Sequence, residues 1–519
     1  MKRDKYIFFY FISILLLVCI VDNRLLANNI QISNVQIIEK NSSAHWANIQ
    51  FDLSYDNAWR INTGASNWCA AWVFVKFRID GGAWKHATLS TNDAHHLMPL
   101  DITGDAASDG KGLFVYDGRI DAGIFNFSAN GVVIRWNYGT DLVSDIATNI
   151  DIKIFGIEMV YIPTGSFNIG TMGSEVNSFY YYTIPGVYLP YQVGSENAIS
   201  IGTSLLGSDL YYKADDLNSG DRLGPIGATF PKGYNKFYLM RYEISQQQYV
   251  DFLNTLSRPD QNTRTNSNVS VSTINNNFVL SNTNSVVNRN AVSCPKTGNG
   301  TTNPINFYCD YNGDGIGNEL NDGQTIACGY LIWADGLAYL DWAGLRPMTE
   351  LEFEKACRGI AGSVPNEYAW GNIIATQTIS PIINSGQSSE MITNSGDGLA
   401  NFDETQVGLG PLRCGFAATA STNRVQSGSG FYGILNLSDN LTERCVTVGS
   451  PEGRSFIGTH GDGSLTTDPG WPNVNGQSAR GGNYLRQSFR MCISNRSFGV
   501  DPDNSRWENW GWRGARTAE

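Results

Sequence analysis

Alternation of hydrophobic and polar positions dominates the chain from about residue 30 to residue 154. The clearest alternating runs are 35–37, 47–51, 73–79 and 132–136. A period of two is typical of strands with one buried face, and Gly and Asn-Asp pairs separate the runs. The sequence Asp80-Gly81-Gly82 is a hairpin signal after one of them. This pattern predicts an all-β sandwich module over residues 28–155.

Hydrophobic spacing of three and four residues predicts two helices in the second part of the chain. The first covers 245–256, with Ser245 as N-cap, and the second covers 349–358, with Thr349 as N-cap. Between them, residues 258–305 are dominated by Asn, Thr and Ser. We therefore expect a polar surface insertion at 258–328, and an α+β domain with little regular structure over 156–519.

The first residues predict export. Lys2, Arg3 and Lys5 precede an apolar run over 6–21, and polar residues follow before Ala27. This order is typical of a signal peptide, here 1–27, and the run is short for a membrane span. The alternatives are a lipoprotein, lipidated at Cys19, and an uncleaved membrane anchor. Each predicts an exported protein, located outside the cell, at the cell surface or in the periplasm.

Charge and cysteine content narrow the function further. The net charge is −12, from 36 Lys+Arg and 48 Asp+Glu, so no basic stripe is available for a nucleic-acid backbone. Eight of the nine cysteines lie outside the predicted signal peptide, and no CxxC pair occurs. A four-ligand zinc site is not expected, whereas export permits disulfides whose pairing the spacing does not reveal.

Seven segments occur in an order that identifies a family. They are MVYIPTGSFNIG (159–170), FYLMRYEISQQQYVDFLN (237–254), LRPMTELEFEKACRG (345–359), YAWGN (368–372), FYGILNLSDNLTER (431–444), ARGGNYLRQSFR (479–490) and GWRGAR (511–516). Together they resemble the formylglycine-generating enzyme, or sulfatase-modifying factor, family. The resemblance implies a variant C-type-lectin-like fold for residues 156–519.

The chemistry of that family depends on two cysteines, which hold copper(I) and attack a substrate thiol. The two positions that the resemblance assigns fall on Arg486 and Met491. Neither side chain supplies the thiolate that a soft metal needs. Cys492 is one residue away from the second position, and we interpret it as structural. Copper binding is therefore not expected, and the prediction leans towards a protein that is not an enzyme.

Calcium is the cofactor that the resemblance implies instead. It assigns the side chains of Asn436 and Glu443 and the carbonyl groups of Asp439 and Leu441 as ligands, and hard oxygen ligands suit calcium. The usual tryptophans beside this site are replaced by Thr442 and Arg444.

A second loop, CDYNGDGIGNELNDG (309–323), carries a separate calcium signal. Its candidate ligands lie at alternate positions, as in the start of an EF-hand loop: Asp310, Asn312, Asp314 and Asn318. Asn321 replaces the usual bidentate Glu, and Asp322 follows it. The alternative is an Asn/Gly-rich turn closed by a Cys309–Cys328 bridge.

Three features near the family segments are predicted to be structural. Gly481 and Gly482 suggest positive φ or close backbone approach. Arg513 and Arg516 are expected to hold the chain end to carboxylates, and Glu243 is expected to pair with an arginine.

Residues 483–512 mix aromatic residues with Arg, Asn, Ser and Asp, which is the composition of a binding surface. The candidate ligand-binding residues are Tyr484, Arg486, Phe489, Phe498, Trp507 and Trp510. Trp512 is assigned to packing at the domain end. The segment is similar to the variable segment of retroelement-diversified bacterial proteins, which display changeable residues on this fold.

The sequence therefore predicts an exported, non-catalytic binding protein whose C-terminal surface takes a protein or glycan ligand. Nucleic acid is excluded, and the N-terminus is a candidate membrane tether. The alternatives are an oxidase of the formylglycine-generating kind, or a related enzyme with altered chemistry, and a structural component of a cell-surface assembly.

Overall fold

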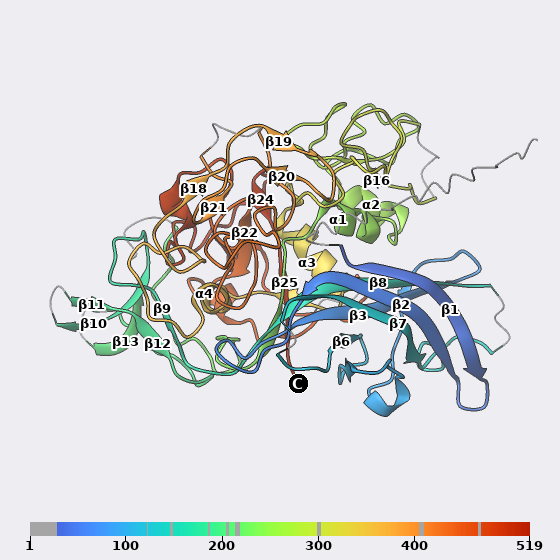
Figure 1. Cartoon of the computed structure of the whole chain (residues 1–519), viewed down its shortest axis with the longest axis horizontal. Coiled ribbons are helices and arrows are strands. Elements are labelled where there is room, and N and C mark those ends of the chain that lie inside the picture. Colours follow the sequence, from blue (N-terminus) through green and yellow to red (C-terminus); the bar gives the residue numbers. More distant parts are fainter. Residues whose placement is uncertain are drawn as a thin grey trace, which may run out of the picture.

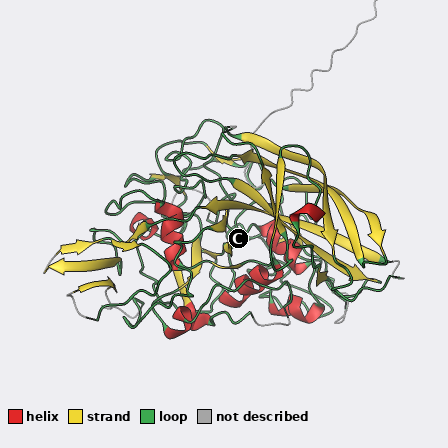
Figure 2. Ribbon diagram, turned by 90° about the horizontal axis from the view of Figure 1, so that it is seen from below, coloured by secondary structure: helices red, strands yellow, loops and turns green. Residues whose placement is uncertain are grey.

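The computed structural model describes most of the chain (Figures 1 and 2). The described residues are 29–121, 123–145, 149–184, 187–203, 207–212, 218–297, 303–403, 409–465 and 469–519. Strands far outnumber helices, as the sequence predicts. The predicted signal peptide, with Cys19, lies outside the described residues. Within them, no helix is long and apolar enough to cross a membrane.

The alternating N-terminal runs form long strands, gathered at the right of Figure 1. One sheet has the antiparallel order β1 (Gln31–Asn41), β2 (Trp46–Ala58) and β7 (Phe125–Trp136). Its inward positions, among them Ile49, Phe51 and Ile134, belong to a core that also contains residues of a second, larger sheet.

The larger sheet extends beyond the predicted N-terminal module. Its order is β17 (Arg346–Pro347), β25 (Gly514–Thr517), β14 (Phe237–Met240), β8 (Ile150–Ile162), β3 (Cys69–Ile79), β6 (Leu113–Asp117) and β5 (Ile102–Ala106), and β4 (Lys85–His86) pairs with β3. Strand β8 pairs with β3 over residues 150–160 and with β14 over 159–162. The boundary predicted at residue 155 thus lies inside a strand that joins the two parts of the chain.

Strand β3 separates two cores. Ala71, Val73 and Val75 face the N-terminal core, whereas Trp72 and Phe74 on the opposite face belong to the largest core, which is built mainly from C-terminal residues. The indole Nε1 of Trp72 donates a hydrogen bond of 2.8 Å to the carbonyl of Ala343. Both faces of β3 are therefore buried, which ties the two predicted units together.

Both predicted helices are confirmed as α1 (Gln246–Leu253) and α4 (Glu350–Arg358). Ser245 and Thr349 are their N-caps, each within a capping box. Three further helices were not predicted: α2 (Arg258–Thr263), α3 (Trp333–Trp342) and α5 (Pro451–Arg454). Helix α3 follows Ile332, which has no side-chain oxygen that could cap it. The helix is buried on most sides, and its sequence therefore lacks the polar stripe of a surface helix.

The predicted surface insertion is in part a core segment. It contains α2, β15 (Val292–Ser293) and β16 (Tyr308–Cys309). Val269, Val279 and Leu280 within it are fully buried in the largest core. The prediction of a surface loop was wrong for these residues, because isolated apolar positions in a polar stretch give no periodic signal. Residues 298–302 lie outside the described part.

The other regular elements are short, which fits a domain with little regular structure. The short strands are β9 (Phe167–Ile169), β10 (Phe179–Ile184), β11 (Val187–Leu189), β12 (Tyr191–Val193), β13 (Gly207–Tyr212), β18 (Thr376–Gln377), β19 (Ile382–Ile383), β20 (Met391–Ile392) and β21 (Leu399–Ala400). Three 3₁₀ helices are η1 (Asp93–His95), η2 (Val474–Gly476) and η3 (Ser488–Met491). Strands β10, β11 and β13 project from the body at the left of Figure 1.

Candidate functional site

A small sheet brings three of the family segments together. Its order is β23 (Gln477–Arg480), β22 (Thr442–Val446) and β24 (Trp510–Gly511). Strand β22 pairs antiparallel with β23 and parallel with β24. The segment that leaves β23 and the segment that enters β24 therefore lie at the same end of the sheet, on either side of β22. These two segments carry the predicted ligand residues.

A cluster of buried ion pairs supports the segment after β23. It consists of three glutamates and three arginines, all buried: Glu350, Glu354, Glu367, Arg358, Arg480 and Arg496. Helix α4 contributes Glu350, Glu354 and Arg358, which are four residues apart and therefore share one helix face. Arg496 donates hydrogen bonds of 2.7 and 3.0 Å to Glu350, and Arg480 pairs with Glu354. Both ends of segment 480–496 are thus held by α4.

The two glycines after Arg480 have the backbone that the sequence predicts. Gly481 and Gly482 have φ values of 93° and 68°. A Cβ atom on Gly482 would lie 2.7 Å from Cγ of Met491, so glycine is required for this close approach.

A second buried ion pair holds the chain end. Arg513 Nε donates hydrogen bonds of 2.9 and 2.8 Å to the two oxygens of Glu443, and both side chains are fully buried. Burial raises the pKa of Glu443, and the charge of Arg513 opposes that shift. Arg516 pairs with Asp109 at 2.7 Å. The predicted roles of both arginines are confirmed.

Glu243 differs from its prediction. It accepts hydrogen bonds from Asn440 Nδ2 at 2.9 Å and from the amide of Leu441 at 3.0 Å, and no ion pair to an arginine is found for it within the described residues. Burial raises the pKa of Glu243 well above its usual value, and the charge of Glu443 adds to the shift. Glu243 therefore orients the loop before β22.

The predicted ligand residues divide into exposed and buried groups. Phe489 is 46% exposed and Trp507 is 44% exposed. Arg486 is also exposed, and Phe498 is partly buried. Tyr484 and Trp510, at 3% and 5%, are buried, so their expected exposure was wrong. Tyr484 packs in a small core, and Trp510 lies in β24 beneath Arg444.

Aromatic rings and guanidinium groups form a connected series of contacts that runs from the exposed Phe489 to the buried Arg444. The Arg490 guanidinium lies 5.4 Å from the Phe489 ring centre and 4.9 Å from that of Phe498. Phe498 contacts Trp510 edge-on at 5.5 Å, and Arg444 lies 4.5 Å from the ring centre of Trp510. Such cation–π contacts fix ring orientation. Sequence reasoning missed Arg490, although its place directly after Phe489 was an available signal. Arg444 has no aromatic neighbour in sequence, and its contact with Trp510 depends on the pairing of β22 with β24.

The hollow on this surface is small. The hollow between Gly482, Arg486, Arg490 and Phe498 has a volume of about 10 Å³. Small-molecule sites have volumes of roughly 300 Å³ or more. The exposed side chains therefore suit contact with a large partner better than enclosure of a small one.

The positions that the family resemblance assigns to cysteines hold no thiol. Arg486 is exposed, and Met491 is buried beneath Gly482. Burial raises the pKa of the neighbouring Cys492 to about 12, so its thiol is neutral at ordinary pH. All eight cysteines of the described residues are free and buried, and the Cys309–Cys328 bridge is not formed in this structure.

The side chains assigned to the first calcium site are engaged elsewhere. Asn436 Oδ1 accepts a hydrogen bond of 2.6 Å from the amide of Gly415, and Asn436 Nδ2 donates one of 3.0 Å to Asp439. Glu443 is held by Arg513. Both assigned side chains are therefore held by protein partners.

The second candidate loop has an acidic centre. Asp310 accepts a hydrogen bond of 3.4 Å from the amide of Gly315, and Asn312 and Asn318 accept from backbone amides nearby. Asp322 is buried, and one of its oxygens has no hydrogen-bond partner. Its burial raises its pKa, and the charges of Asp310, Glu319 and Asp314 add to the shift. Nowhere in the described residues are three His, Cys, Asp or Glu side chains gathered closely enough to hold a metal ion.

Comparison with known proteins gives two matches. A family model described as "Sulfatase-modifying factor enzyme 1-like domain" matches residues 199–518. A curated relative, "Formylglycine-generating enzyme" from Thermomonospora curvata, is 28% identical over 133 residues, which cover 26% of this chain and 37% of the relative. The matched part thus spans little more than a third of that enzyme.

Proposed function

Because this chain belongs to the family of sulfatase-modifying factor enzyme 1-like domains and has Arg486 and Met491 where the resemblance places cysteines, we propose that it is an exported, non-catalytic binding protein. Its ligand is a protein or glycan. The ligand contacts the C-terminal face, which we define as Arg486, Phe489, Arg490, Phe498 and Trp507.

The observation that carries this proposal is an exposed aromatic residue on a segment that buried ion pairs anchor at both ends. Phe489 lies in η3, between two arginines, Arg480 and Arg496, that are anchored on α4 by buried ion pairs. A surface that is already ordered loses little conformational entropy on binding. Exposed Phe and Trp side chains next to Arg are also the types that dominate binding energy at interfaces.

The neutral, buried Cys492 supports a non-catalytic role, because an oxidase of the formylglycine-generating kind needs reactive thiolates. Oxygen consumption by the purified protein with copper and a cysteine-containing peptide tests the enzymatic alternative. Turnover that disappears in Cys492→Ser would establish that alternative and refute the proposal.

Binding is tested with the full mature chain on a glycan array and by capture from cell-surface extracts. The double variant Phe489→Ala/Trp507→Ala is compared with the control Leu100→Ala/Ile120→Ala, which removes exposed apolar side chains from the N-terminal part. We expect the first variant to lose about tenfold or more in affinity for any ligand found, whereas the control keeps wild-type affinity. Equal loss in both variants, or no loss in either, contradicts the assignment of the face.

Three further parts of the proposal have their own tests. Export predicts a mature chain that begins after residue 27, which mass spectrometry of the native protein measures. A lipidated Cys19 or an intact N-terminus would point to a membrane tether.

Diversification of segment 483–512 predicts a near-copy template repeat and a reverse transcriptase beside the gene. Calcium is proposed for the loop around Asp310, Asp314 and Asp322. A cation there would offset the repulsion that Asp310 and Asp314 exert on the buried Asp322, and it would pair the free Asp322 oxygen.

A further inference from the structure

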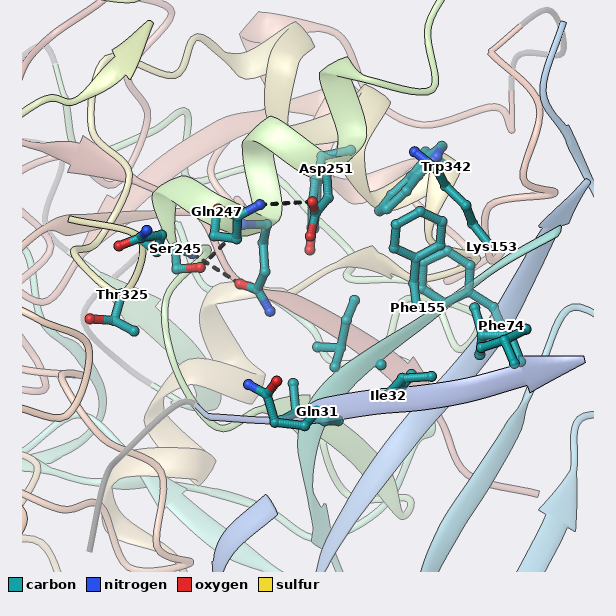
Figure 3. Close-up of a pocket in the computed structure, with 18 of the residues that line it drawn as sticks. Gln31, Ile32, Phe74, Lys153, Phe155, Ser245, Gln247, Asp251, Thr325 and Trp342 are labelled. Carbon is teal, nitrogen blue, oxygen red and sulfur yellow. Dashed lines mark hydrogen bonds between the residues drawn. The ribbon is translucent and has the colours of Figure 1, made fainter. Parts of the chain in front are cut away.

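A cavity of about 620 Å³ lies between the two parts of the chain, away from the C-terminal face. Figure 3 shows it bounded by β1 below and by helix α1 above, and α3 and β8 complete its walls. Its volume is within the range of small-molecule sites in proteins. The function proposed above makes no use of this cavity.

One side of the cavity is polar. Asp251 of α1 accepts a hydrogen bond of 2.9 Å from Gln247 at one oxygen, and no hydrogen bond within the described residues reaches the other oxygen. Gln31 of β1 lies on the opposite wall of the cavity from Asp251 (Figure 3). Burial raises the pKa of Asp251 to about 6, and the Gln247 hydrogen bond and the charge of Lys153 limit the rise.

The other side is aromatic. Phe155 contacts Trp342 edge-on with ring centres 4.8 Å apart, and it stacks with Phe74 at 5.4 Å. All three residues line the cavity (Figure 3). Because the rings support one another, Phe155 offers a fixed apolar wall close to the polar groups.

The charges and hydrogen-bonding groups define the ligand. Asp251 and Lys153 are the charged side chains among the lining residues, and their charges balance. The other polar lining groups are mainly glutamine amides, which both donate and accept. Gln248 already accepts the amide of Ser245 at its oxygen and keeps its NH₂ group as a donor. A purely apolar ligand would leave these groups unpaired, at a cost in binding free energy. A ligand with a net charge of either sign would be repelled by one of these two side chains.

We propose that this cavity is a binding site for a small neutral saccharide, whose hydroxyl groups bond to Asp251 and the glutamine amides and whose C–H face packs on Phe155. Sugar hydroxyls both donate and accept, which matches an amide lining with one carboxylate. The site is separate from the C-terminal face, so the two assignments stand or fall independently.

The test is calorimetric titration of the full mature chain with four probes: maltose, cellobiose, lactose and chitobiose. We expect at least one to bind, and we expect Asp251→Asn and Phe155→Ala each to weaken that binding by about tenfold or more. Phe489→Ala/Trp507→Ala is the matched control and should bind the same sugar as the wild type does.

Circular dichroism and thermal unfolding establish that each variant is folded, and Gln31→Ala provides a third variant from the opposite, more exposed wall. No heat with any of the four sugars overturns the proposal. So does a sugar that binds equally to wild type and to folded Asp251→Asn and Phe155→Ala, because that sugar binds elsewhere. Loss of sugar binding in Phe489→Ala/Trp507→Ala would assign the saccharide to the C-terminal face instead.

Discussion

Several buried arginines in the C-terminal part pair with a buried carboxylate at close range. Arg513 with Glu443 and Arg496 with Glu350 are examples in which both side chains are fully buried. Such pairs add little net stability over well-packed apolar residues, but removal of one partner leaves an uncompensated charge. Their effect is to specify one arrangement of the segments that they join.

Replacement of Arg513 by glutamine tests this point. Glu443 would be buried without its partner, and the backbone carbonyls of Met240 and Leu435 would lose a donor. We expect the free energy of unfolding to fall by about 3–5 kcal/mol. Urea denaturation followed by circular dichroism measures the change.

Arg78→Gln is the control, because Arg78 and Asp151 form an exposed pair, with 36% and 55% of their side chains accessible. The Arg78→Gln variant should lose at most about 1 kcal/mol of unfolding free energy. Similar losses of unfolding free energy in Arg513→Gln and Arg78→Gln would show that burial of the Arg513–Glu443 pair does not increase the cost of removing one partner.

Asp251 gives the stability a defined pH dependence. Its pKa rises from 3.8 to about 6 on folding, so the folded state holds the proton more tightly than the unfolded state does. The contribution of Asp251 to the free energy of unfolding is therefore greatest below about pH 4, falls as the pH rises to about 6, and is constant at higher pH. The measurement is the difference in unfolding free energy between wild type and Asp251→Asn from pH 4 to pH 8. A difference that is flat, or that changes in favour of the wild type with rising pH, contradicts the assignment.

Helix α4 is the element on which the C-terminal segment depends, and its first turn is held by Thr349. Thr349 Oγ1 accepts a hydrogen bond of 3.1 Å from the amide of Glu352 and donates one of 2.9 Å to the carbonyl of Pro231. We expect Thr349→Ala to destabilise the protein by about 1–2 kcal/mol, whereas Thr349→Ser keeps the hydroxyl and most of the stability. Thermal unfolding of both variants measures this, and equal losses would show that the hydroxyl is unimportant.

The loop around Asp314 is an element whose order should depend on calcium. Binding would bring the carboxylates of Asp310, Asp314 and Asp322 together and remove their mutual repulsion. We expect added calcium to raise the melting temperature of the wild type and to have little effect on Asp314→Asn. Asp439→Asn, which lies outside this loop, should keep the response. A melting temperature that is insensitive to calcium refutes the proposal.

Elements with local signals were predictable, and those that depend on distant contacts were not. Helices α1 and α4 begin at side chains that cap them, so a few neighbouring residues determine them. Helix α3 is stabilised by burial on most sides, and its sequence carries no such signal. At the candidate site, composition indicated Phe489 and Trp507 correctly as exposed but could not separate them from Tyr484, which packs against residues far away in sequence.

The whole molecule is joined by one continuous sheet. Strand β8 pairs with β3 on the N-terminal side and with β14 on the C-terminal side, and β25 at the chain end belongs to the same sheet. Trp72 and Phe74 of β3 are buried in the core that holds most of the C-terminal part. The predicted sandwich module is thus not a separate unit, because its larger sheet continues into the family domain.

This continuity predicts that the two predicted units do not fold independently. Division at residue 155 cuts β8, separates its C-terminal half from β3 and removes Trp72 from its core. Each fragment then has an exposed strand edge, and such an edge promotes aggregation. We expect residues 28–519 to unfold in one cooperative transition by calorimetry, and residues 156–519 alone to be insoluble or without a transition. Residues 28–519 that carry a nick after Gly362 provide the control, because Gly362 is exposed and lies outside every strand, so that break leaves the sheet intact. Two separate transitions in the full chain, or a folded fragment 156–519, would show that the shared sheet does not couple the two parts.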